Sequence, residues 1–378
     1  MTARPLGFGR RAEDVTEPPG EKPVPPGAVA MDDASMGALL PGRDARGHKG
    51  TFGKLLVIAG SLDYAGAALL VCRAAGRTGA GLVTLAVPES LQPLFAAKVV
   101  EATTMALPED DLEEVDPEPA LAKILDHEHD ALVIGPGLRP SLATADLLRL
   151  LLTVPEDPAP VPAVLDAEAL RTLASADSWW TATTRRCVLT PHGGEFARLR
   201  AGSGHDPAVD GDLDRDDAAR VAAARAAATE WGQVVVLKGA RTVVAPPAGE
   251  ATIAPFENPA LASGGTGDVL AGTIGALLAQ GLDPFAAARL GVYLHGLAGE
   301  AVRERFGDAG LLASDLPESI TLARKRLAAL NERSRRQSRL GFGAREPVAR
   351  QVASAPAAAA PDDPATAAPD DPAGSNRP

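Results

Sequence analysis

The chain has 378 residues, a length that suits one large α/β domain or two ordinary ones. Apolar residues make up 46% of the sequence and aromatic residues only 3%, so we expect a core built mostly from Ala, Leu and Val. The formal net charge of -12 disfavours general nucleic-acid binding, because an acidic protein repels the phosphate backbone. No apolar run is long enough to cross a bilayer, so we expect no membrane partner.

Composition divides the chain into three parts. Residues 1–35 are rich in Pro, Gly and charge, and we expect a disordered N-terminal segment there. Residues 36–330 form the expected folded domain, and residues 331–378 a disordered tail that is first basic and then rich in Ala, Pro and Asp. The basic run at 322–350 is typical of a solvated helix end. Contact with RNA or anionic lipid is the alternative interpretation of this run.

Short apolar runs alternate with longer helical stretches through the middle of the chain. Runs bounded by Gly, Pro or Asp predict strands, and stretches of small and aliphatic residues predict helices. The expected strands are 54–59, 82–87, 131–134, 163–165, 187–189, 234–237, 242–245 and 251–254, and the expected helices are 65–78, 141–152, 214–231, 268–280, 284–305 and 314–330.

Continuous apolar strands separated by helices are typical of a parallel sheet covered on both faces. We therefore expect an α/β fold, a three-layer α/β/α sandwich with a mostly parallel central sheet. Such sheets bind ligands at the carboxyl ends of their strands, and five predicted strands end in polar or glycine-rich residues. Cys72 and Cys187 lie in apolar runs and indicate buried free thiols in a reducing, cytoplasmic setting.

The most informative segment is the glycine-rich turn Ser263–Gly267, which leads directly into an apolar helix. Its backbone amides and the positive end of that helix would form an anion site. Asp268 stands at the edge of the site, where a carboxylate repels phosphate but can take the proton of a hydroxyl that attacks phosphorus. The segment alone leaves open that Asp268 merely favours the helix N-terminus electrostatically.

Three other strand ends suit a phosphate or nucleotide site. Lys238–Thr242 offers a cation, backbone amides and a hydroxyl for a nucleotide, or is a hairpin turn with a solvated cation. Pro191–Glu195 opens a helix, and its His192 is a candidate base, metal ligand, hydrogen-bonding contact or plain polar residue. Gly135–Gly137 ends a strand in a turn without side chains. Neither a GxGxxG fingerprint nor a Walker A lysine motif is present.

Taken in order, these segments resemble the ADP-dependent NAD(P)H-hydrate dehydratase family, within the ribokinase-like superfamily, over roughly residues 36–330. The resemblance implies a repair enzyme that acts on the S epimer of hydrated NADH or NADPH. ADP would donate a phosphoryl group to the C6 hydroxyl and leave as AMP, and the phosphate would then be eliminated. The segments that carry the resemblance are His48–Gly53, Ala59–Ser61 with Ala65–Ala67, Gly135–Leu138, Leu189–Glu195, Lys238–Gly239 and Asn258–Asp268.

By position, the resemblance implies roles for individual residues. Asp268 would be the catalytic base, and Mg²⁺ would bridge phosphate oxygens without direct protein ligands, with Glu195 able to reach it through water. The implied anion hole is Gly264, Gly265, Thr266 and Gly267; the hydrated cofactor would contact Ala67, Gly137, His192 and Asp268; and the adenine nucleotide would contact Lys238, Gly239, Ala240, Arg241, Thr242 and Gly267.

The resemblance also implies partners. Many relatives carry a fused epimerase domain, but fewer than fifty residues precede His48, so we expect a separate NAD(P)H-hydrate epimerase to act upstream. We expect a homo-oligomer, a tetramer by analogy. Two other readings stay open at this point: a ribokinase-like kinase of a small thiamin-precursor alcohol, and a non-catalytic nucleotide-binding module, against which an intact Asp268 argues.

Overall fold

A ten-stranded sheet lies at the centre of the fold in the computed structural model, which describes residues 22–155 and 159–339. The strand order is β1-β10-β9-β8-β7-β6-β5-β2-β3-β4. Strand β9 pairs antiparallel with both neighbours, and the other neighbouring strands pair in parallel. The strands are β1 (Ala28–Ala30), β2 (Lys54–Ile58), β3 (Leu82–Pro88), β4 (Thr103–Leu107), β5 (Ala131–Ile134), β6 (Ala163–Leu165), β7 (Cys187–Leu189), β8 (Val234–Leu237), β9 (Val243–Ala245) and β10 (Ala251–Ile253).

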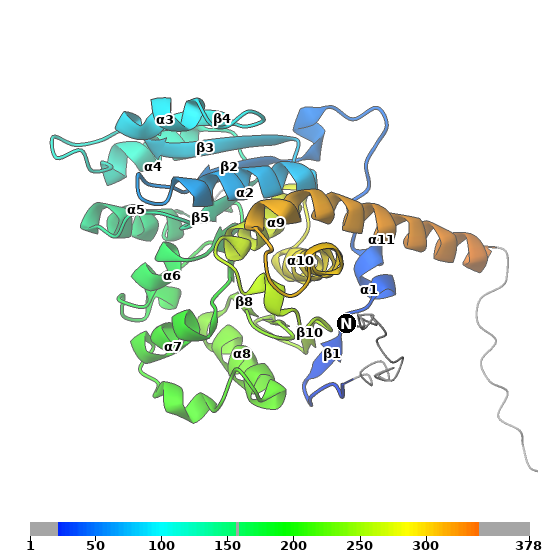
Figure 1. The fold of residues 1–378 in the computed structure, drawn as a ribbon. Helices are drawn as coiled ribbons and strands as arrows, with labels where there is room; N and C mark the ends of the chain where they lie inside the picture. The colour runs from blue at the N-terminus through cyan, green and yellow to red at the C-terminus, as the bar shows by residue number, and fades with distance from the viewer. Residues whose placement is uncertain (1–21, 156–158, 340–378) are drawn as a thin grey trace, which may run out of the picture. The chain divides into compact units, whose positions relative to one another are not determined.

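Helices cover both faces of this sheet (Figure 1). The helices on the first face are α1 (Asp33–Ala38), α2 (Ala65–Thr78), α3 (Gln92–Ala96), α9 (Thr266–Ala279), α10 (Pro284–Phe306) and α11 (Leu316–Arg339). Those on the second face are α4 (Pro117–Asp126), α5 (Leu142–Leu152), α6 (Glu168–Leu173), α7 (Gly193–Gly202) and α8 (Asp217–Trp231).

The side chains of β2 show why the sheet needs both helical layers. Leu55 and Val57 join the hydrophobic cluster of the first face, and Leu56 and Ile58 join that of the second. Successive residues of a strand point to opposite faces, so an unbroken apolar run must be covered on both sides. The predicted three-layer α/β/α class is therefore confirmed.

Helix α9 packs unusually close to its neighbours and is buried from Val269 to Ala279. A Cβ atom added to Gly272 would lie 2.4 Å from the carbonyl oxygen of Val71 in α2. One added to Gly275 would lie 2.3 Å from a methyl carbon of Val133 in β5. These two glycines let α9 sit directly against α2 and β5, and this packing fixes the position of the helix's N-terminus.

The eight predicted strands are present, with ends that differ by at most one residue. The predicted helices are present as well, and the last one runs on to Arg339 instead of ending at 330. Strands β1 and β4 and the short helices α1, α3, α4 and α6 were not predicted, whereas α7 (Gly193–Gly202) begins within Pro191–Glu195, where a helix start was expected.

The expected disorder of residues 1–35 is wrong for residues 22–35. Ala28–Ala30 form β1, which extends the sheet in parallel with β10, and Asp32 caps α1 by accepting a hydrogen bond from the Ser35 amide. The rest of the expected N-terminal segment, 1–21, and the tail 340–378 lie outside the described residues.

Cys72 and Cys187 are buried free thiols, as predicted. Burial raises the pKa of both thiols to about 12, so neither is a ready nucleophile. Among the residues that the structure describes, no helix is both long and apolar enough to cross a bilayer.

The close packing of α9 generates a stability prediction. Gly272→Ala places a methyl group against the backbone of α2, and we expect it to lower the free energy of unfolding by about 1–3 kcal/mol. Gly76→Ala is the matched control, because an added Cβ there has open space and Gly is the poorer helix former. Urea unfolding should show the first variant less stable and the second equal to or more stable than the unaltered protein. Equal stability of all three would contradict the packing argument.

Candidate active site

Charged side chains from neighbouring strands meet at the carboxyl edge of the sheet, at the start of α9. Asp166 follows β6, His192 follows β7 and Lys238 follows β8, while Asp268 lies in the first turn of α9. All four line one cavity of about 1060 Å³. That volume can hold a nucleotide together with part of a second ligand.

The N-terminus of α9 is built to receive an anion. Its N-cap Gly265 has a φ of +88°, in the left-handed region, and no side chain caps the helix. Its first amides are therefore free of side-chain acceptors, and the helix dipole adds positive potential there. A Cβ atom on Gly267 would lie 3.4 Å from the Lys238 Nζ atom, so the missing side chain leaves space beside this cation. Such a site suits a phosphate group.

Lys238 is the cation of the site and is surrounded by carboxylates. Its Nζ atom lies 2.9 Å from Asp166 Oδ1 and 3.7 Å from Glu195 Oε2. Burial by itself lowers the pKa of the ammonium, but Asp166, Glu195 and Asp268 outweigh burial, so the pKa of Lys238 is raised. Asp166 is buried, and its Oδ1 atom also accepts a hydrogen bond of 2.8 Å from the Thr190 hydroxyl. Lys238 therefore stays charged and fixed in place.

Asp268 has the proton affinity of a general base that works near neutral pH. Burial raises its pKa, the nearby Asp166 carboxylate raises it as well, and the Lys238 ammonium partly opposes both, which leaves the pKa at about 7. A carboxyl group with this pKa can take a proton from a hydroxyl during a reaction and release it again. Perturbed groups of this kind concentrate at functional sites.

His192 and Glu195 together cap the start of α7. The His192 Nδ1 atom accepts a hydrogen bond of 3.1 Å from the Gly194 amide, and Glu195 Oε2 accepts one of 2.9 Å from the His192 amide. The Nδ1 lone pair is thus occupied, and the Nε2 atom lies 3.6 Å from Glu195 Oε1. Glu195 binds the loop and also faces Lys238, so it links α7 to the cation.

His295 in α10 also lines the cavity and was not predicted. Its Nε2 atom lies 3.0 Å from the Thr266 carbonyl oxygen in the first turn of α9. Burial lowers the pKa of His295 to about 4, so the ring is neutral at pH 7 and its Nε2–H donates to that carbonyl. A histidine within a long apolar helix gives no sequence signal for this support of the α9 N-terminus.

The cavity gathers most of the residues singled out in the sequence. Four of them do not line it, namely Ala67, Gly137, Gly264 and Arg241. Ala67 and Gly137 lie together nearby, since a Cβ atom on Gly137 would be 2.9 Å from that of Ala67. The predicted residues that line the cavity are His192, Glu195, Lys238, Gly239, Ala240, Thr242, Gly265, Thr266, Gly267 and Asp268.

The sequence analysis expected Arg241 to contact the nucleotide, but its side chain points away from the cavity. Its guanidinium donates to Asp217 Oδ2 at 2.7 Å and to the Pro23 carbonyl at 3.2 Å, so it ties the loop to α8 and to the N-terminal segment. The loop itself is supported by buried Arg220, which donates to the carbonyl oxygens of Ala240 and Leu213. Arg220 was not predicted, because its role depends on packing between distant segments.

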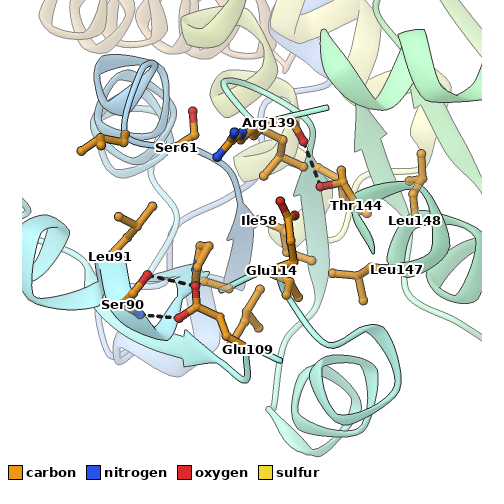
Figure 2. Close-up of a pocket in the computed structure, with 18 of the residues that line it drawn as sticks. Ile58, Ser61, Ser90, Leu91, Glu109, Glu114, Arg139, Thr144, Leu147 and Leu148 are labelled. Carbon is orange, nitrogen blue, oxygen red and sulfur yellow. Dashed lines mark hydrogen bonds between the residues drawn. The ribbon is translucent and has the colours of Figure 1, made fainter. Parts of the chain in front are cut away.

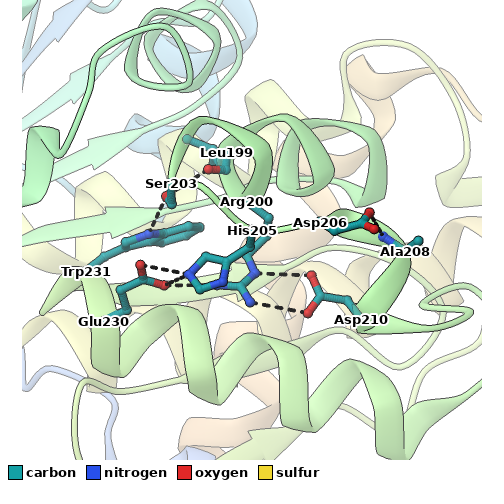
Figure 3. A network of polar contacts seen from close by, with 9 residues as sticks. All are labelled: Leu199, Arg200, Ser203, His205, Asp206, Ala208, Asp210, Glu230 and Trp231. Atoms are coloured by element: carbon teal, nitrogen blue, oxygen red, sulfur yellow. Dashed lines mark hydrogen bonds and ion pairs between the residues drawn. The ribbon is translucent and has the colours of Figure 1, made fainter.

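A polar network next to the site holds the connection between α7 and α8 (Figure 3). Arg200 pairs with Asp210 at 3.1 Å and with Glu230 at 2.9 Å, and His205 shares Glu230. This connection also carries Asp214, which lines the cavity and lies 3.6 Å from where a Gly193 Cβ atom would be. The network therefore positions a further carboxylate, not found from the sequence, at the α7 end of the cavity.

The cavity contains few side chains that could bind a metal ion directly. Within residues 22–155 and 159–339, no group of three or more His, Cys, Asp or Glu side chains is arranged to hold one. Asp166 and Glu195 both line the cavity, and Mg²⁺ is commonly held by one or two carboxylates together with phosphates and water. The donor set fits Mg²⁺ carried in on a nucleotide.

The raised pKa of Asp268 generates a prediction about stability. A carboxyl group whose pKa rises from 3.8 to about 7 on folding binds its proton more tightly in the folded state. Folding stability therefore falls as the pH rises through this range. We expect Asp268→Asn to unfold at a higher temperature than the unaltered protein, with a gain on the order of 1–3 kcal/mol that grows up to about pH 7 and then levels off.

Thermal unfolding between pH 5 and 8 measures this gain. Glu118→Gln is the control, since Glu118 is exposed on α4 and lies outside the cavity. A gain for Asp268→Asn that does not depend on pH would contradict the assigned environment of Asp268.

Comparisons with known proteins agree with the geometry. A model of the NAD(P)H-hydrate dehydratase family matches residues 55–322. The bifunctional NAD(P)H-hydrate repair enzyme Nnr of Moorella thermoacetica is 43% identical, over 73% of this chain and 50% of that protein. The ADP-dependent (S)-NAD(P)H-hydrate dehydratase of Neisseria meningitidis serogroup B is 38% identical, over 74% of this chain and 88% of that protein.

A solved structure has a similar fold. The ADP/ATP-dependent NAD(P)H-hydrate dehydratase from Bacillus subtilis, co-crystallised with ATP and Mg²⁺, has a TM-score of 0.66 and 33% identity, covering 79% of this chain and 99% of that chain. The present chain spans about half the length of the bifunctional relatives that it matches. The sandwich has the same fold as a ribokinase-like superfamily protein from Enterococcus faecalis, with a TM-score of 0.66 at 24% identity, covering 82% of this chain and 99% of that chain. Because the family model covers well over half of the sequence, this chain belongs to the NAD(P)H-hydrate dehydratase family.

Proposed function

We propose that this protein catalyses the ADP-dependent dehydration of the S epimer of hydrated NADH and NADPH, and so returns these damaged cofactors to NADH and NADPH. The observation that carries the proposal is Asp268, a carboxyl group with a pKa of about 7 at the uncapped start of α9. Family membership and the names of the relatives support it.

The proposed reaction needs a base for the C6 hydroxyl and positive charge beside the transferred phosphoryl group, and the site can supply both. The C6 hydroxyl attacks the β-phosphorus of ADP while Asp268 takes its proton, so a new P–O bond forms and the bond to AMP breaks. The α9 amides and Lys238 stabilise the negative charge on the transferred phosphoryl group. The lone pair of the ring nitrogen then expels phosphate, and loss of the C5 proton restores the dihydropyridine. The net products are NAD(P)H, AMP and phosphate.

The remaining groups bind and orient the two substrates. Lys238 to Thr242, with Gly267, would hold the adenine nucleotide through backbone amides and the lysine ammonium. His192, through its Nε2 atom, and the nearby pair Ala67 and Gly137 would contact the hydrated cofactor. Mg²⁺, when bound to the nucleotide, would neutralise phosphate charge, and Asp166 and Glu195 are placed to hold it directly or through water.

The cellular setting is also a proposal. An epimerase that converts the other hydrate epimer to the S form would supply substrate, in keeping with the bifunctional naming of several relatives. The buried free thiols Cys72 and Cys187 suit a cytoplasmic enzyme. The expected homotetramer stays a prediction.

Asp268→Asn tests the base assignment. We expect turnover to fall by at least about 100-fold, because general-base catalysis typically contributes that much or more. The affinity for ADP should be unchanged or higher, since the variant removes a negative charge beside the phosphates. Purified protein is mixed with hydrated NADH, Mg²⁺ and either ADP or ATP, and the return of the reduced-nicotinamide absorbance is followed. Nucleotide binding is measured separately by calorimetry.

The same assay decides the function. Recovery of NADH with ADP and release of AMP supports the dehydratase, and recovery with ATP alone would correct the donor. The function would be refuted by a lack of recovery with either donor, above all if a small alcohol were phosphorylated instead. Activity of Asp268→Asn within about tenfold of the unaltered enzyme, roughly 1.4 kcal/mol of barrier, would refute the base assignment alone.

The charges around Asp268 generate a second prediction. The rate should rise with pH and level off above about 7, because only the ionised carboxylate accepts a proton. Asp166→Asn removes a carboxylate that raises the pKa of Asp268, and should move this rise to lower pH by roughly one unit. Lys238→Met removes the cation that lowers it, and should move the rise to higher pH. The midpoint of the pH–rate profile is the readout, and shifts in the same direction would contradict the assignment.

A further inference from the structure

A second cavity opens at the same edge of the sheet, beside the ends of β2 to β5 (Figure 2). Its volume is about 390 Å³. Its floor is apolar and belongs to the hydrophobic cluster of the second face, with Ile58, Leu107, Ile134, Leu147 and Leu151 among the residues that form it. The size and the floor suit a planar, weakly polar group such as a nucleobase.

Charged side chains surround the mouth of this cavity. They are four carboxylates and one guanidinium, from Asp63, Glu109, Glu113, Glu114 and Arg139. The mouth is therefore strongly acidic. It accepts hydrogen-bond donors such as ribose hydroxyls and repels additional phosphate groups.

Four of these charged groups, all except Glu109, are available to a ligand. In the described parts of the chain, the side chains of Glu114 and Arg139 form no hydrogen bond or ion pair with another residue, and Figure 2 shows both directed into the opening. Glu109, in contrast, accepts hydrogen bonds of 2.6 and 2.9 Å from the amide and hydroxyl of Ser90. Asp63, Glu113 and Glu114 are thus acceptors without a partner among the described residues, and Glu114 is the one that Figure 2 shows directed into the opening, together with the cation Arg139.

The loop that carries Glu114 is held in one conformation. The Asp110 carboxylate accepts hydrogen bonds from the Leu112 amide at 2.8 Å and from the Glu114 amide at 3.0 Å. Glu113 has a φ of +59°, in the left-handed region, which is unfavourable for a non-glycine residue and persists only where the surroundings enforce it. The backbone that carries Glu114 is therefore held by the Asp110 carboxylate.

The second cavity adjoins the proposed site. Leu138 lines it and directly follows Gly137, which touches Ala67. On the other side, Ala169 lines the second cavity while Asp166 and Ala167 line the first. A long ligand that has its reacting end at Asp268 and passes Ala67 and Gly137 is led into the second cavity.

A hydrated dinucleotide is such a ligand. Its two nucleosides are joined by a pyrophosphate, which needs positive charge where it crosses between the cavities. Helix α2 starts there without a side-chain cap, at Tyr64, and the free guanidinium of Arg139 lies at the mouth. Free helix amides and an arginine are groups that commonly bind phosphate.

We propose that the second cavity binds the adenosine end of the hydrated dinucleotide, and that Glu114 makes hydrated NADH a better substrate than hydrated NADPH. The inference rests on the proposed dehydratase function. A ribose 2′-hydroxyl can donate a hydrogen bond to a carboxylate, as in many dinucleotide sites. The 2′-phosphate of NADPH instead brings nearly two more negative charges to an acidic mouth that has a single arginine.

Two lysine variants four residues apart test the proposal. We expect kcat/KM of the unaltered enzyme to be roughly tenfold or more higher for hydrated NADH than for hydrated NADPH. Glu114→Lys should lower this ratio by roughly tenfold, through the KM of hydrated NADPH and with kcat little changed. Glu118→Lys makes the same change of charge on the exposed start of α4, outside the cavity, and should leave the ratio within about twofold.

Two further kinetic measurements test where the adenosine end of the substrate binds. Arg139→Ala should raise KM for both hydrates alike, because it removes a contact to the pyrophosphate that they share. Hydrated reduced nicotinamide mononucleotide, which lacks the adenosine end, should have a KM at least about tenfold higher than hydrated NADH, and that KM should not respond to Glu114→Lys.

The possible outcomes separate this inference from the function on which it rests. Turnover of both hydrates with equal kcat/KM, unchanged in Glu114→Lys, would overturn the subsite and leave the dehydratase function intact. Equal responses of Glu114→Lys and Glu118→Lys would overturn it as well, because they would show a general charge effect. A lack of turnover of every hydrated cofactor with both ADP and ATP would overturn the dehydratase function and this inference together.

Discussion

The site depends on one ammonium group placed among carboxylates. Lys238 lies 2.9 Å from Asp166 and 3.7 Å from Glu195, and it lowers the pKa of Asp268 against the effect of burial. Without this cation the carboxylates would repel one another at the sheet edge, and Asp268 would hold its proton too tightly to act as a base near neutral pH. The same cation offers the phosphate groups of a nucleotide a partner in a cavity that is otherwise acidic.

The fold keeps these charges in place by packing. Helix α9 reaches the sheet edge at one position only, because Gly272 and Gly275 let it contact α2 and β5 without intervening side chains. The neutral ring of His295 then holds the first turn of α9 through the Thr266 carbonyl. Asp268 and the α9 amides are in this way aligned with Lys238, which arrives on a different element, β8. A site assembled from strand ends and a helix start needs such packing, since no single segment contains it.

Much of this arrangement was predictable from the sequence, for physical reasons. Strands buried on both faces are unbroken apolar runs, so their limits could be read to within a residue, and their polar ends marked the site. The edge strands β1 and β4 escaped prediction because their pattern of exposed and buried residues carries a weaker signal. Asp166 could not be identified as a site residue, since its partner Lys238 lies 72 positions away in the sequence. The direction of the Arg241 side chain could not be predicted, because a sequence does not show which way a side chain leaves a turn.

Binding of the phosphoryl donor would change the proton affinity of Asp268. A bound diphosphate adds negative charge close to Asp268, which raises the carboxyl pKa beyond the value of about 7 that the protein alone imposes. Cations that accompany the donor act in the opposite direction, and Lys238 limits the change from the protein side. The proton affinity of Asp268 therefore depends on whether the nucleotide is present and how fully its charge is neutralised. In the proposed reaction, Asp268 would therefore be a weaker base in the empty enzyme and a stronger one beside the phosphate that the substrate hydroxyl attacks.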